Sequence, residues 1–252
     1  MFFLIFSFAC KQPIEAPNQL ESLCAFLFAN HSLTEESEMG IQNLVQWTEE
    51  NEIHEDGYRI DNLHEEDLDN SDAPIGDLDL QMGVAILNSL QIPPEDLSYA
   101  ISGLSPQIVA PETFLSAERE YAYGEECFWD YSCDKQAFYS NLEIAFPLGV
   151  VANGYLYSEL MWVDTEYGMA LLQRDWLLEE AQMNVNWIHI DAQYSLSAVI
   201  PIQNQHSLRL DSLWSVLRLG ETPVDSDIGM SLLVGKSQKT IEEILIYLDE
   251  QE

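Results

Sequence analysis

The sequence predicts an α+β protein in which N-terminal helices pack on a C-terminal antiparallel sheet of about six strands, closed by a short C-terminal helix. Two observations predict this class. Apolar residues recur every three or four positions over much of residues 19–139, as along one side of a helix, and every two positions over much of residues 140–252, as in a strand. Short turn-like pieces between the later segments imply antiparallel neighbours.

Four helices are expected in the first half. The segment "NQLESLCAFLFAN" (18–30) has one apolar stripe, and "TEESEMGIQNLVQWTEEN" (34–51) opens with a threonine and acidic residues typical of a helix start. The third candidate is "DLDLQMGVAILNSL" (77–90). The fourth is "PPEDLSYAISGL" (93–104), whose two prolines favour a first helical turn.

The clearest strand is "WIHIDAQYSLSAVIP" (187–201). Its apolar positions fall on one face, and its polar positions, which include Gln193, Ser195 and Ser197, fall on the other. This alternation predicts a strand with one face on the core and the other in water. Further strands are expected at 155–163, 168–178, 207–219 and 229–235.

The chain closes with "TIEEILIYLDEQ" (240–251), in which Thr240 and Glu243 form a T-x-x-E capping box. A curved antiparallel sheet that wraps a C-terminal helix resembles the helix-grip arrangement of START-type lipid-binding domains. The resemblance covers residues 140–250 and rests on the order of the elements; the last helix is shorter than in that family. It implies a lipid-like or hydrophobic ligand in the concave face of the sheet.

The charge balance limits the partners. The chain has 44 acidic and 9 basic residues and a net charge of −35. Nucleic-acid binding needs clustered Lys and Arg and is therefore not expected. The same charge opposes contact with an anionic membrane surface, so membrane association would have to come from a covalent lipid.

The N-terminus suggests such a lipid. "MFFLIFSFAC" holds an apolar run that is too short to cross a bilayer. It resembles the end of a bacterial lipoprotein signal peptide, in which a small residue, here Ala9, precedes the lipidated cysteine, here Cys10. The resemblance implies a signal peptide over 1–9 and anchoring to the outer membrane, on its periplasmic or its outer surface. On this interpretation, residues 10–18 form a tether and residues 19–252 form a single domain. The alternative is a plain apolar N-terminus that packs on the domain.

The other cysteines are Cys24, Cys127 and Cys133. The last two are six positions apart in "ECFWDYSCDK", which predicts a small disulfide loop in an oxidising compartment. Zinc is the rival interpretation, but no second Cys or His pair stands at ligand spacing. Cys24 lies among apolar residues and reads as a buried free thiol.

Two motifs fall short of a binding site. "GMSLLVGKS" ends like a phosphate-binding loop, but five residues separate its glycines where four are needed, so we expect a strand end followed by a helix start. The acidic run at 54–79 carries oxygens that suit calcium. An EF-hand pattern beginning at Asp67 places Leu78 where a bidentate Glu is required, so a solvated surface loop is the favoured interpretation.

Arg174 is the most unusual cation, because its predicted strand face is otherwise apolar and includes Trp176. A buried arginine needs a partner. That partner is either a carboxylate such as Glu159 or the anionic head group of a ligand, which arginine suits well. Arg174 and Trp176 are therefore the candidate ligand-binding residues.

We expect an acidic lipoprotein of the cell envelope with no catalytic centre, cofactor or metal, which binds a hydrophobic or lipid-like ligand. The alternative is a structural or protein-interaction module with a filled core. An enzyme is a third class, because carboxylates are plentiful and the sequence does not show which lie together. A cavity lined by apolar groups would favour ligand binding.

Overall fold

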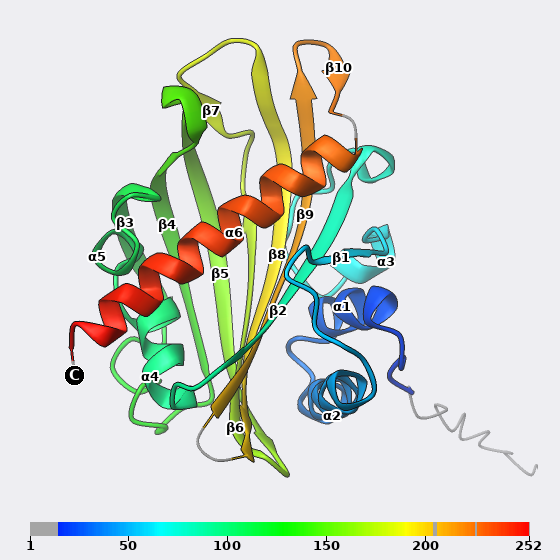
Figure 1. Ribbon diagram of the computed structural model, residues 1–252, viewed down its shortest axis with the longest axis vertical. Coiled ribbons are helices and arrows are strands. Elements are labelled where there is room, and N and C mark those ends of the chain that lie inside the picture. Colours follow the sequence, from blue (N-terminus) through cyan, green and yellow to red (C-terminus); the bar gives the residue numbers. More distant parts are fainter. Residues whose placement is uncertain (1–14, 204–205, 225, 252) are drawn as a thin grey trace, which may run out of the picture.

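The computed structural model describes residues 15–203, 206–224 and 226–251 (Figure 1). Its largest element is one antiparallel sheet of ten strands, where the sequence predicts about six. The strands follow the order β1-β2-β9-β8-β6-β5-β4-β3, with β10 beside β9 and β7 beside β5. Their bounds are β1 (Tyr58–Ile60), β2 (Met82–Leu90), β3 (Phe114–Tyr123), β4 (Lys135–Ala145), β5 (Val151–Thr165), β6 (Gly168–Leu177), β7 (Gln182–Met183), β8 (Ile188–Ile202), β9 (His206–Leu219) and β10 (Thr222–Pro223).

Helices pack on both faces of this sheet. The C-terminal helix α6 (Ser226–Asp249) has 24 residues, so the short helix predicted at this end of the chain is wrong in length. Helix α6 crosses one face diagonally (Figure 1). The other face is covered by α1 (Leu20–Ala29), α2 (Thr34–Glu50) and α3 (Glu65–Leu68). The remaining short helical pieces are η1 (Leu78–Leu80), α4 (Pro94–Ser98), η2 (Tyr99–Gly103), α5 (Pro106–Val109) and η3 (Pro147–Gly149). We call the two sides of the sheet the α6 face and the α1 face.

Successive residues of a strand point to opposite faces, so one strand serves two cores. In β6, Leu172 packs in a core with side chains of α1 and α2, whereas Leu171 packs with Ile241 and Ile244 of α6. The α1-face core also buries Trp214, whose indole nitrogen donates a hydrogen bond to the Asp61 carbonyl at 2.8 Å.

The helix predicted over 77–90 is wrong, because this segment forms η1 and β2. Ala85 and Leu87 of β2 pack in the α1-face core, whereas Val84 and Ile86 lie on the α6 face. A strand that is buried on both faces has a continuous apolar run, which lacks the period of two and can be mistaken for a buried helix.

The strand predicted over 229–235 is also wrong, since these residues lie inside α6. The capping box at residue 240 fails for the same reason: the Thr240 hydroxyl donates to the Lys236 carbonyl, one turn earlier in the same helix. The two glycines of this segment lower helix propensity and obscured the helix. Gly229 has a packing role, because a Cβ there would collide with the Met82 side chain of β2.

Other expectations agree with the structure. Four predicted strands are confirmed as β5, β6, β8 and β9, and two predicted helices as α1 and α2. The segment 93–104 forms α4 and η2. The change of period expected near residue 140 is wrong in position, because β1, β2 and β3 precede it in the same sheet. Among the described residues, none of the helices combines the length and apolarity needed to cross a membrane.

Candidate binding site between the sheet and helix α6

The polar face of β8 does not lie in open water. Gln193 and Ser195 point toward α6 and line a cavity of about 190 Å³ between this helix and the sheet. Ser140 of β4, Ser158 of β5 and Asp175 of β6 line the same cavity. We call it the polar cavity; its other lining residues are Ile101, Pro106, Phe114, Arg119, Phe138, Leu142, Ile144, Leu156, Gln173 and Lys236. The alternation in the sequence therefore predicted the strand correctly, but its polar side is enclosed by the C-terminal helix.

Asp175 is the buried acid of this cavity, with 9% of its surface exposed. The Gln173 side-chain amide donates to one of its carboxylate oxygens at 2.7 Å, and the Ser195 hydroxyl donates to the other at 3.2 Å. Burial raises the pKa of Asp175 above its usual value, and hydrogen bonds from Ser158, Gln173 and Ser195 only partly oppose that rise. The carboxyl group is held in place by neutral donors.

Arg119 of β3 supplies a cation at the edge of the polar cavity. Its Nη1 donates to the Ser102 carbonyl at 2.6 Å, and its guanidinium lies 4.5 Å from the centroid of the Phe138 ring. Within the described part of the chain, its Nε has no hydrogen-bond partner. Burial lowers the pKa of Arg119, while nearby Tyr121 and Asp175 raise it.

Lys236 projects from α6 and lines both the polar cavity and a second cavity above it. Its ammonium lies 4.5 Å from the centroid of the Phe146 ring. The ammonium group makes no hydrogen bond or ion pair with any residue that the structure describes. Desolvation by burial lowers the pKa of Lys236 to about 8.

The second cavity has a volume of about 280 Å³ and is almost entirely apolar. It lies between η3, β7, β8, β9 and the first half of α6. We call it the apolar cavity; it is lined by Phe146, Pro147, Leu148, Val150, Met183, Trp187, Ile188, Ile190, Gln193, Leu213, Ser215, Leu217, Leu219, Val224, Leu232, Leu233 and Lys236. Gln193 and Lys236 line both cavities, so the two adjoin.

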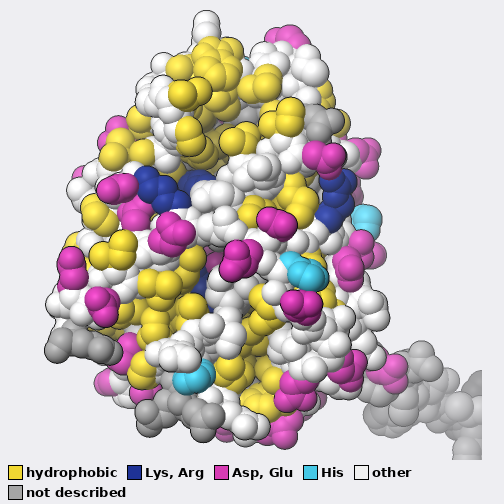
Figure 2. All heavy atoms as spheres, viewed as in Figure 1, with side chains coloured by type: hydrophobic (Ala, Val, Ile, Leu, Met, Phe, Trp, Pro, Cys, Tyr) yellow, Lys and Arg dark blue, Asp and Glu magenta, His cyan; other side chains and the backbone are white. Residues whose placement is uncertain are grey.

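The mouth of the apolar cavity is an exposed apolar rim. Leu148 is 98% exposed at the turn between β4 and β5, and Trp187 is 49% exposed. Figure 2 shows hydrophobic side chains gathered at the upper end of this face, whereas acidic groups are scattered over the rest of it. The rim thus connects an apolar interior with the surface.

A second charged pair lies on the α6 face. Nε of Arg209 is 2.8 Å from an Asp211 carboxylate oxygen, and both side chains are largely buried. The hydroxyls of Ser197 and Ser237 donate to Asp211 at 2.9 and 3.5 Å. Because Ser237 belongs to α6, this cluster ties the helix to β8 and β9.

Arg174 and Trp176 lie on the opposite, α1 face, and neither lines the polar or the apolar cavity. Arg174 is 1% exposed. It donates from Nε to Glu159 at 2.8 Å, from Nη1 to the Phe28 carbonyl at 3.1 Å, and from Nη2 to the Asn70 carbonyl at 2.6 Å. Of the two partners considered for Arg174, the structure contains the carboxylate.

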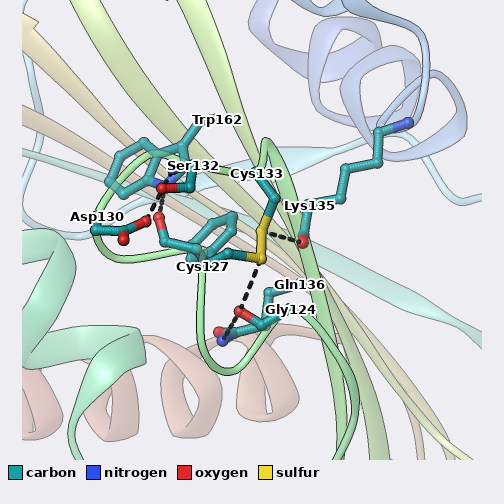
Figure 3. The surroundings of a disulfide bond; sticks show 9 residues. Gly124, Cys127, Asp130, Ser132, Cys133, Lys135, Gln136 and Trp162 are labelled. Carbon is teal, nitrogen blue, oxygen red and sulfur yellow. Dashed lines mark hydrogen bonds between the residues drawn. A yellow bond between two sulfur atoms is a disulfide. The ribbon is translucent and has the colours of Figure 1, made fainter.

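Cys127 and Cys133 are joined by a disulfide with their Cα atoms 5.3 Å apart, on the loop between β3 and β4 (Figure 3). The loop packs on the α6-face core, and the Trp162 indole donates to the Phe128 carbonyl at 3.0 Å. Cys24 is a buried free thiol whose pKa burial raises to about 12. Cys10 lies outside the described residues.

The two weak motifs have ordinary structural roles. Lys236 and Ser237 lie in the interior of α6. The segment that resembles a phosphate-binding loop is therefore helical and does not form such a loop. The Asp67 carboxylate accepts a hydrogen bond from the His64 backbone at 2.7 Å and caps α3. Asp175, Arg119 and Lys236 were not selected as site residues from the sequence. The polar positions of β8 were the one signal that could have pointed to this face.

No protein-family model matches the chain, and none of the curated proteins matches its sequence. Among solved structures it is similar to a START superfamily protein from Mycobacterium smegmatis (12% identity, TM-score 0.42, 67% of this chain and 95% of that chain covered). It is also similar to the human StarD13 lipid transfer and protein localization domain (11% identity, TM-score 0.43, 81% and 95% covered). A third is the Zhui aromatase/cyclase from Streptomyces (11% identity, TM-score 0.42, 68% and 93% covered). Similarity at this level transfers neither a ligand nor an activity.

Proposed function

We propose that this protein binds a small hydrophobic or amphipathic molecule between the sheet and α6, and that it acts by binding rather than by catalysis. The observation that carries the proposal is the apolar cavity with its open, apolar rim. An apolar cavity of about 150 Å³ is large enough for benzene, so one of about 280 Å³ holds a chain of roughly ten carbons.

The surroundings of the cavity support the same proposal. Ligand sites are typically apolar clefts with a few convergent polar groups that fix orientation. Here the apolar cavity adjoins a polar one, and Gln193 and Lys236 stand where the two meet. A solid interior, as in a purely structural module, would provide neither cavity.

Titration with the uncharged dye Nile red tests the proposal. The wild type should bind the dye and release it when decan-1-ol is added. Leu233 is 6% exposed and lines the apolar cavity, so Leu233→Trp should fill that space and abolish binding. Ile246 is 61% exposed on the same helix, and Ile246→Trp is the matched control. Equal dye binding by both variants, or none by the wild type, would favour the structural-module alternative.

We also propose that the chain is an outer-membrane lipoprotein anchored through Cys10. This proposal rests on the apolar run before Ala9 and Cys10 in the sequence and is independent of the cavity. Growth of expressing cells with a clickable fatty acid should label the wild type and leave Cys10→Ala unlabelled. Equal labelling of the two proteins would refute the anchor.

A further inference from the structure

Lys236 differs from the other described cations in having no polar partner. Ion pairs join Arg59 to Asp227, Arg174 to Glu159, Arg209 to Asp211, Arg218 to Asp191, and Lys239 to Glu112 and Glu243. Arg119 and Lys135 donate to backbone carbonyls. Among the described cations, Lys236 alone has a side chain with neither a hydrogen bond nor an ion pair. The chain has 44 acidic residues, yet none of those that the structure describes pairs with this cation.

The nearest candidates for a partner are already engaged. Asp175 lines the polar cavity together with Lys236, but its oxygens accept from Gln173 and Ser195. Asp211, on the strand facing α6, is paired with Arg209. The ammonium of Lys236 instead faces the Phe146 ring and the junction of the two cavities. A half-buried cation without a counter-charge is partly desolvated, which is unfavourable for the empty protein, and an anion bound at this junction would reduce that penalty.

We propose that the ligand of this protein carries an acidic group, which pairs with Lys236 while the apolar part of the ligand fills the apolar cavity. This inference rests on the proposed function and names the class of ligand: a medium-chain amphiphile with a carboxylate or a similar anionic head. Gln193 lines both cavities and Ser195 the polar one, so both stand beside the bound head group.

The test compares decanoate with decan-1-ol, which have the same chain length and differ in charge. Each is titrated against the Nile red complex of the full chain. The wild type should bind decanoate at least roughly tenfold more tightly, since a hydrogen bond to a charged group strengthens binding by about that factor. Lys236→Met should lose this preference and leave the affinity for decan-1-ol within about twofold. Lys236→Arg should retain it.

Lys239→Met is the matched control, because Lys239 is half exposed on the same helix and lines neither cavity. It should bind both compounds as the wild type does. Equal affinity of the wild type for decanoate and decan-1-ol, or an unchanged preference in Lys236→Met, would overturn the assignment and leave the proposed function standing. Failure to bind either compound would overturn both. If Lys236→Met does not fold, Lys236→Gln takes its place in the same comparison.

Discussion

The α1 face and the α6 face of the sheet use neighbouring residues of the same strands in opposite ways. On the α1 face, the Arg174 guanidinium donates to one carboxylate and two carbonyls, and aromatic rings fill the space around it. On the α6 face, one residue along, Asp175 borders a cavity that it shares with Lys236. The first face satisfies its buried charge within the protein, whereas the second leaves a half-buried cation available. This contrast distinguishes a structural ion pair from a candidate binding group.

Loss of Arg174 should have the largest effect on stability. In Arg174→Met, Glu159 and the two carbonyls lose their donor, and breaking a buried pair in this way costs about 3 to 5 kcal/mol. In contrast, Lys236→Met removes an unpaired cation and should not lower the free energy of unfolding. Urea denaturation of both variants measures the difference. A larger loss for Lys236→Met than for Arg174→Met would reverse the roles that we assign to the two faces.

The disulfide should have the next largest effect, because it closes the loop that covers part of the α6-face core. Replacing both Cys127 and Cys133 with Ser should lower the free energy of unfolding by about 2 to 3 kcal/mol. Thiol titration of the unreduced Cys10→Ala protein should find no reactive group before unfolding and Cys24 alone after it, since the Cys24 thiol is buried and its pKa is raised to about 12. Three reactive thiols after unfolding would show that the bond is absent.

The α1 face should also be sensitive to acid through His31. Burial and the charge of Arg174 lower the pKa of this imidazole from 6.5 to about 3. Between these values the unfolded chain takes up a proton that the folded chain does not, so stability falls as the pH drops below 6.5, by about 1.4 kcal/mol per pH unit. Urea denaturation at pH 6.5 and pH 5 should show a loss of about 2 kcal/mol that His31→Gln lacks. An equal loss in that variant would assign the acid sensitivity to other groups.

The α6 face should show a smaller effect of opposite sign through Asp175. Because burial raises its pKa, the folded protein holds this proton more tightly than the unfolded chain, and the contribution to stability decreases as the pH rises above the usual carboxyl value. Asp175→Asn should therefore increase the free energy of unfolding at pH 7 by up to about 1 kcal/mol, a gain that is absent at pH 3. Destabilisation by Asp175→Asn at pH 7 would show that the charged carboxylate is required for the fold.

The strands with one polar and one apolar side, such as β8, could be predicted because their period is visible in the chain. The covering of the polar side of β8 by α6 could not be predicted. A period of two shows which residues share a face but not which element packs on it, and α6 follows β8 in the chain only after β9 and β10. β2 was missed because Val84 and Ile86 are as buried as Ala85 and Leu87. The sequence correctly indicated that Arg174 is a buried cation beside apolar groups. It did not show whether Glu159 or a ligand pairs with Arg174, because that depends on which helices cover this face of the sheet.

The order of strands also affects how the protein is made. β2 pairs with β9, and even the nearest pair, Leu90 with Ser207, is separated by more than a hundred residues of chain. Ribosomes add about 5 to 20 residues per second, so β9 follows β2 by roughly 6 to 25 seconds. During that interval the apolar residues of β2 have no neighbouring strand on the β9 side, and long-range pairings of this kind form slowly. The nascent chain should therefore be most prone to misassociation before β9 is available to pair with β2.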